Sequence, residues 1–280
     1  MLIAFLCTGV GVFLASYLYS IDDWSLLYYG DSVSHLVRAR EIVESLSPGL
    51  QQIGTVWLPL PHLLLLPFSL VSSLFTTGFA GTFVSLPSTA VAAAILYKML
   101  RADSGILWIA VVGGCLYFSN PNIIYLGLTA MTEAPFMLFF IVSAYYFQRC
   151  FFPAQTHSYS RKAQANKNFR VIGHFYFFSI IGFQDKTDHS YKLSNTMNLF
   201  RCSLFIALAT LCRYEAWPIP IFLLVLLTIS FMRATKTIER TENPSYSATR
   251  KRLTFILVSC TLLSFSGVII WISYNMVYYG

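Results

Sequence analysis

Apolar runs separated by short polar breaks occupy most of the chain. A membrane core about 30 Å thick needs roughly 20 apolar residues for each helix that crosses it. Runs of this kind predict membrane-spanning helices near Leu2–Tyr19, Phe79–Leu100, Gly105–Asn120, Glu133–Cys150, Leu199–Cys212, Ala216–Met232 and Leu253–Val277. The Leu199 run is short, so its helix is expected to start earlier. The pattern predicts an all-α, polytopic transmembrane helical bundle.

One further apolar run, Leu58–Phe75, contains Pro59, Pro61 and Pro67. A proline inside a helix removes a backbone hydrogen bond and clashes with the preceding turn. Two interpretations stay open: the run crosses the membrane, or it is a broken segment packed against other helices. The prolines favour the broken segment.

The stretch Tyr28–His62 differs from the rest because its charged, polar and apolar residues are interleaved. It predicts an amphipathic helix over Asp31–Leu46 that lies at the membrane interface. At 100° per residue the residues divide into two arcs, a polar arc of Asp31, Ser34, Arg38, Glu41 and Ser45 and an apolar arc of Val33, Leu36, Val37, Val43 and Leu46. Ser47, Pro48 and Gly49 are expected to end it.

Composition agrees with a membrane protein. Of 280 residues, 56% are hydrophobic and only 11% are charged, against about 25% charged in a soluble domain, and the mean hydropathy is +0.62. Six cysteines lie in or beside apolar runs without a CxxC pair, which predicts small core side chains rather than metal ligands. The first apolar run lacks a basic leader and a cleavage site, so it is expected to be retained.

The net charge of +7 reflects membrane orientation rather than nucleic-acid binding. Sixteen of the 19 basic residues lie in three loops on one side of the predicted bundle, which are expected to be cytoplasmic. The longest, residues 151–199, is interpreted as a basic cytoplasmic insertion with an aromatic island at Gly173–Phe183. The loops around Glu133 and Arg213 then face outside or lumen. Asp31 joins them only if Leu58–Phe75 does not cross.

Three acidic residues at membrane boundaries are candidate functional groups: Asp31, Glu133 and Glu215. An ionisable side chain beside hydrocarbon is costly, so function is the first explanation to test. Structural explanations remain open for each. Asp31 and Glu133 could stabilise helix starts, and Glu215 could form an ion pair with Arg213.

Two histidines give a weak metal-site signal. His35 follows Asp31 by one helical turn, and His62 ends the run WLPLPH. Together with Asp31 or Glu133 they could bind a divalent metal ion, although their spacings do not form a ligand signature. Contact with an acceptor substrate is the other use considered for them.

Four motifs in order carry a family resemblance. They are GDSVSHLVRAR with SPGLQQIGTVWLPLPHLLLLPF, NPN at Asn120–Asn122, TAMTEAPF, and RYEAW at Arg213–Trp217. They resemble membrane glycosyltransferases of the GT-C fold, in particular the dolichyl-phosphate-mannose-protein mannosyltransferase-like group. The resemblance implies a single transferase domain over residues 1–280, juxtamembrane helices in the first outer loop, and further spans beyond residue 280 in a complete member.

The resemblance also implies a reaction: transfer of a sugar, such as mannose, from a polyprenyl-phosphate donor to a hydroxyl of a glycan, lipid or protein, with inversion. The acceptor must lose a proton, so Asp31 is the expected general base. Glu133 would orient the acceptor or hold a divalent ion.

The remaining expected roles concern the leaving phosphate. Arg213, with Arg38 and Tyr214, would bind it, and Glu215 would fix Arg213. The insertion at 151–199 has no counterpart in the family pattern. A transporter or flippase for a lipid-linked or small solute, and a non-catalytic membrane subunit, are the alternatives.

Overall fold

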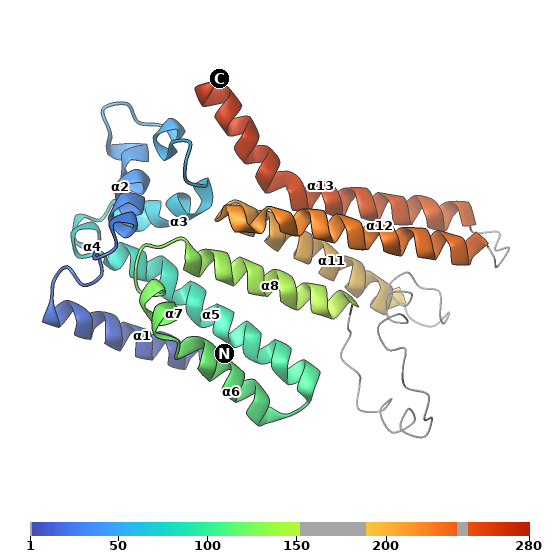
Figure 1. Ribbon diagram of the computed structural model, residues 1–280, viewed down its shortest axis with the longest axis horizontal. Helices are drawn as coiled ribbons and strands as arrows, with labels where there is room; N and C mark the ends of the chain where they lie inside the picture. The colour runs from blue at the N-terminus through green and yellow to red at the C-terminus, as the bar shows by residue number, and fades with distance from the viewer. Residues whose placement is uncertain (1, 152–188, 240–245) are drawn as a thin grey trace. The chain divides into compact units, whose positions relative to one another are not determined.

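The computed structural model describes residues 2–151, 189–239 and 246–280, and these ranges are helical, with turns and loops but no β-strand. The α-helices are α1 (Leu2–Ile21), α2 (Gly30–Glu44), α3 (Pro59–Ser69), α4 (Ser72–Thr77), α5 (Phe79–Ser104), α6 (Leu107–Phe118), α7 (Pro121–Leu126), α8 (Glu133–Phe151), α11 (His189–Thr210), α12 (Pro218–Glu239) and α13 (Tyr246–Tyr279) (Figure 1). Two short 3-10 helices, Leu50–Ile53 and Tyr214–Ala216, lie in the loops. The all-α prediction is therefore confirmed for the described residues.

Within the described ranges, four helical stretches are long and apolar enough to cross a membrane: Leu2–Ile21, Phe79–Ser104, Tyr214–Arg233 and Arg250–Tyr279. The predicted span at Gly105–Asn120 is instead the shorter helix α6 followed by α7. Gly105 ends α5 in the left-handed conformation, at φ +67°, and Asn120 and Pro121 start α7. These residues shorten the helix between them.

The proline-containing run is broken in the structure. Pro59–Ser69 forms α3, Leu70 and Val71 interrupt the helix, and Ser72–Thr77 forms α4. Eleven residues at about 1.5 Å each give α3 a length of only about 16 Å, roughly half of the membrane core. Neither α3 nor α4 is long enough to cross by itself.

The chain divides into two compact units. The first comprises Met1–Val142, Ala207–Trp217 and Ser266–Gly280, and the second comprises Ser143–Ile206 and Pro218–Phe265. In the first unit α5 packs against α1 and α6, and α2 packs on α3 (Figure 1). The inner face of α5 is built from small residues such as Ala90, Ala92 and Ala93, which allow close helix approach.

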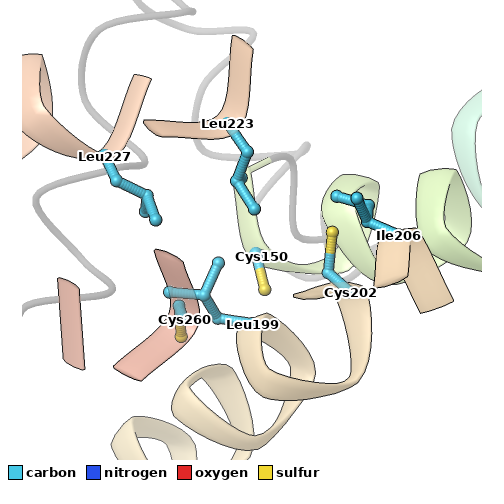
Figure 2. Packing of buried hydrophobic residues seen from close by; sticks show 7 residues of the cluster. All are labelled: Cys150, Leu199, Cys202, Ile206, Leu223, Leu227 and Cys260. Atoms are coloured by element: carbon cyan, nitrogen blue, oxygen red, sulfur yellow. The ribbon is translucent and has the colours of Figure 1, made fainter. Parts of the chain in front are cut away.

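The second unit has a core of leucines and cysteines. Figure 2 shows Cys150, Cys202 and Cys260 with Leu199, Ile206, Leu223 and Leu227, all nearly inaccessible to solvent. All six cysteines of the chain are free, and five are buried. The prediction that they serve as small core side chains is confirmed for those five, while Cys115 is exposed.

Two predictions about the chain between α8 and α11 have different outcomes. The expected early start of the Leu199 helix is confirmed, because α11 begins at His189. The basic insertion and its aromatic island lie mostly at residues 152–188, outside the described residues.

Candidate functional site

Four segments that are distant in sequence meet within the first unit. The backbone N–H of Ala130 donates to Ser32 Oγ at 3.1 Å, which joins the start of α2 to the segment before α8. The N–H of Leu60 donates to the carbonyl of Leu211 at 3.1 Å. These two bonds connect the regions of the motifs that carry the family resemblance, with the exception of NPN.

The segment before Glu133 is fixed by the face of α5. Thr82 Oγ1 donates to the carbonyl of Leu128, and Ser85 Oγ donates to that of Thr129, both at 2.6 Å. Gly81 lies against the backbone of Ala130, where a Cβ atom would clash. The small and hydroxyl-bearing residues of α5 therefore set the position from which α8 begins.

Arg213 is the centre of the charged part of the site. Its Nε and Nη2 donate to the two carboxylate oxygens of Glu215 at 3.2 and 2.8 Å, while Nη1 donates to Glu133 Oε1 at 2.5 Å and to Thr132 Oγ1 at 3.1 Å. The expected ion pair of Arg213 with Glu215 is present, and Glu133 joins it. The hydrogen bond to Glu215 is the largest cause that raises the pKa of Arg213, so the guanidinium stays charged.

The two carboxylates around Arg213 differ in exposure. The side chain of Glu215 is 61% exposed and that of Glu133 is 29% exposed. Glu133 Oε2 is enclosed and has no hydrogen-bond partner within the described residues. Since two carboxylates surround one guanidinium, the cluster has an excess negative charge. A phosphate could take the paired donors of Arg213 only by displacing a carboxylate, and Glu215 is the more exposed of the two.

His35 and His62 form a buried pair beneath this region. His35 Nδ1 and His62 Nε2 are 3.0 Å apart, and His62 Nδ1 is 3.0 Å from the carbonyl oxygen of Leu58. The ring of Trp57 lies 4.7 Å from that of His35 between centroids. The sequence suggested these two histidines separately, but their direct contact depends on the packing of α3 against α2.

Burial keeps both imidazoles neutral. Burial, and then the positive charge of Arg213, lowers the pKa of His35 to about 4. Burial likewise lowers the pKa of His62 to about 4, and the neighbouring His35 adds to this effect. The bond from the Leu60 N–H to the Leu211 carbonyl links α3, which carries His62, to the segment that leads to Arg213.

Asp31 lies in the first turn of α2 and is exposed. Tyr29 occupies the N-cap position, and no side chain makes a capping bond there. The alternative in which Asp31 caps this helix is therefore not observed. Among the described residues its carboxylate has no hydrogen-bond or ion-pair partner. Asp31 precedes His35 by one turn on the same side of α2.

Glu133 begins α8 as predicted, so a favourable effect on the helix start remains compatible with its ion pair. Arg38 is exposed and pairs with Glu41 at 3.0 Å on its own helix. Its expected role as a phosphate ligand stays a prediction. The two arcs predicted for α2 also differ from its packing. Leu36 is buried, whereas Val33 and Val43 are exposed.

Tyr214 has a structural connection that the sequence did not indicate. Its hydroxyl donates to the carbonyl of Val56 at 3.1 Å and accepts from Trp271 Nε1 at 3.0 Å. Tyr274 and Tyr279 donate to the carbonyls of Leu50 and Gln51 at 2.9 and 2.6 Å. The last turns of α13 therefore hold the loop between α2 and α3. The Tyr214 hydroxyl already has two hydrogen-bond partners.

The described residues contain no group of three His, Cys, Asp or Glu side chains placed to hold a metal ion. The histidine pair lacks a third ligand there, so these residues do not fit the divalent-ion site considered from sequence. Comparisons with protein-family models, with curated proteins and with solved structures find no match for this chain.

Proposed function

We propose that this protein is an inverting membrane glycosyltransferase with a GT-C-like arrangement, which transfers a sugar from a polyprenyl-phosphate donor to an acceptor hydroxyl. The supporting observation is a free carboxylate in the same unit as the Arg213 guanidinium: Asp31 has no partner within the described residues. Ser32 next to it bonds to the segment that leads into Glu133 and Arg213. This pairing of a base with a cation suits the chemistry of glycosyl transfer.

In the proposed reaction the acceptor oxygen attacks the anomeric carbon as Asp31 accepts its proton. The bond between the anomeric carbon and the phosphate oxygen breaks, and the phosphate keeps the electron pair. Arg213 stabilises this negative charge after the exposed Glu215 leaves the guanidinium. Glu133 stays bound to Arg213 and positions it.

The proposed protein crosses the membrane several times, and the reaction takes place at its outer or lumenal face, in the plasma membrane or the endoplasmic reticulum. Two observations support a common side for Asp31, Glu133 and Arg213. Each of α3 and α4 is too short to cross, and Arg213 bonds directly to Thr132 and Glu133. An apolar groove between spans would hold the polyprenyl chain.

The test uses purified full-length protein in lipid nanodiscs with polyprenyl-phosphate mannose as the donor and methyl α-D-mannopyranoside as the acceptor. Asp31→Asn is expected to lower kcat by about 100-fold or more, because a general base contributes this much, while donor binding changes less than twofold. Asp23→Asn, an exposed carboxylate in the preceding loop, is the matched control. Unchanged turnover in Asp31→Asn would overturn the assignment of the base.

A further inference from the structure

The chain of hydrogen bonds through His62 and His35 has a fixed direction. A carbonyl oxygen accepts but never donates, so His62 Nδ1 must carry the proton that it shares with Leu58. In a neutral imidazole the other nitrogen, His62 Nε2, is then an acceptor. His35 Nδ1 must donate to it. His35 Nε2 is therefore left with a lone pair and no proton.

The surroundings preserve this arrangement. His35 is 3% exposed and His62 is fully buried, and Arg213 and Arg38 both disfavour additional positive charge there. With both rings neutral, the carbonyl of Leu58 determines the tautomer of each.

The lone pair of His35 Nε2 has no hydrogen-bond partner within the described residues. A donor that reaches this nitrogen therefore finds an available acceptor and gains a hydrogen bond. The donor must be neutral or nearly so. A phosphodiester or carboxylate offers no proton at neutral pH. A hydroxyl group fits these conditions.

Asp31 supplies a second acceptor nearby. It precedes His35 by four residues in α2, a spacing that separates Cβ atoms by about 5–6 Å on one helix face. Because both side chains start from the same face of one helix, a single molecule with two hydroxyl groups can reach both acceptors. The ring of Trp57 lies against His35 and provides an aromatic surface beside the pair.

We propose that His35 Nε2 accepts a hydrogen bond from a second, non-reacting hydroxyl of the acceptor, so that the acceptor is a carbohydrate or other polyol rather than a simple alcohol. This proposal rests on the proposed transferase function. Asp31 accepts the proton of the reacting hydroxyl, whereas His35 binds and orients the acceptor. His62 is a positioning residue that fixes the tautomer of His35.

The first experiment is independent of activity. Nitrogen NMR of the full-length protein with 15N-labelled histidine in nanodiscs at pH 7.5 is expected to show both His35 and His62 protonated at Nδ1 and unprotonated at Nε2. Methyl α-D-mannopyranoside without donor is expected to shift the His35 Nε2 resonance. A proton on His35 Nε2, or no shift at saturating sugar, would overturn the proposal even if the protein is an active transferase.

The second experiment separates polyol acceptors from simple alcohols. His35→Phe is expected to raise KM for methyl α-D-mannopyranoside about tenfold, the value of roughly one hydrogen bond, with KM for 1-octanol and for the donor unchanged. His35→Gln retains a polar atom near Nε2 and is expected to recover most of the affinity. His62→Phe removes the bond that fixes the tautomer of His35. It is expected to raise KM for methyl α-D-mannopyranoside by less than His35→Phe does. Thr76→Ala, an exposed hydroxyl that bonds only within α4, is the control.

The outcomes keep the two proposals apart. If wild-type protein transfers no sugar but the His35 Nε2 resonance shifts with the mannoside, the transferase function fails and the polyol site stands. If transfer occurs and His35→Phe changes KM equally for the mannoside and for 1-octanol, the transferase function stands and the polyol site fails.

Discussion

At the scale of single residues, Arg213 has more partners than the sequence suggested. Its guanidinium binds Glu133, Glu215 and Thr132 simultaneously. The sequence indicated the pair with Glu215 because the two are only two residues apart, but Thr132 and Glu133 are about 80 residues away and gave no sign of contact. The same applies to His35 and His62, whose rings meet across two helices.

The buried histidine pair predicts a specific pH dependence of stability. Each histidine has a folded-state pKa of about 4, below the ordinary value of about 6.5. The unfolded chain therefore binds more protons between these values, so stability is full above pH 6.5 and falls as the pH decreases toward 4. Thermal unfolding in detergent is expected to show a lower Tm at pH 5 than at pH 7.5.

A double substitution, His35→Gln with His62→Gln, tests the source of this effect. It is expected to reduce the difference in Tm between pH 7.5 and pH 5, because both histidines with a lowered pKa are removed. The other histidines of the chain remain and provide the internal control. An unchanged pH difference in the double variant would contradict the assignment to this pair.

At the scale of elements, α5 is the helix that positions the site. Its hydroxyl groups hold the carbonyls of Leu128 and Thr129, and Gly81 allows the backbone of Ala130 to approach. The sequence predicts α5 only as an apolar span. The small and hydroxyl-bearing residues along α5 predict close packing against this helix. The sequence does not indicate which segment packs against it.

Gly81→Val is expected to destabilise the protein, because the added side chain collides with the backbone of Ala130 rather than with a flexible side chain. Overpacking of this kind typically costs about 1–3 kcal/mol. Gly9→Val in α1 is the matched control, since no atom lies within 4 Å of the position of its Cβ. Thermal unfolding of both variants measures the difference, and equal Tm values would contradict the close contact.

At the scale of the whole molecule, the described helices include four that are suited to cross a membrane. Helix α5 is 26 residues long, about 39 Å at 1.5 Å per residue, so its two ends can reach opposite membrane surfaces. Its first turns contact the segment before Glu133. The proposed topology therefore puts the site at one surface and the last turn of α5 at the other.

Accessibility labelling tests this topology. In a background with the six native cysteines replaced by serine, single cysteines are introduced at the exposed positions Val33, before α3, Thr76, at the end of α4, and Ala102. A membrane-impermeant maleimide applied to intact cells is expected to distinguish Ala102→Cys from the other two, which share one side. Different sides for Val33→Cys and Thr76→Cys would show that α3 and α4 do not return to the same surface, and the proposed site would be divided.

Sequence alone determined the helical class, because hydrophobic runs of membrane length need no tertiary information to be recognised. It also predicted the start of α8 at Glu133, because helix-start residues act locally. The predicted break in the proline-containing run is present, although it falls at Leu70 and Val71 while Pro67 lies inside α3. It identified the charged and imidazole groups of the candidate site one by one. It did not identify the shortening of α6, where local breakers at both ends outweighed an apolar composition.

Only the tertiary structure decided which of these groups meet. The pairing of Arg213 with Glu133, the contact of His35 with His62 and the connection from Tyr214 to Trp271 join residues that are 27 to 80 positions apart. Hydrophobic periodicity records which side of a helix is buried, but it contains no information about the partner on the other side. Long-range packing of α2, α3, α5 and α8 therefore fixed the geometry that the sequence left open.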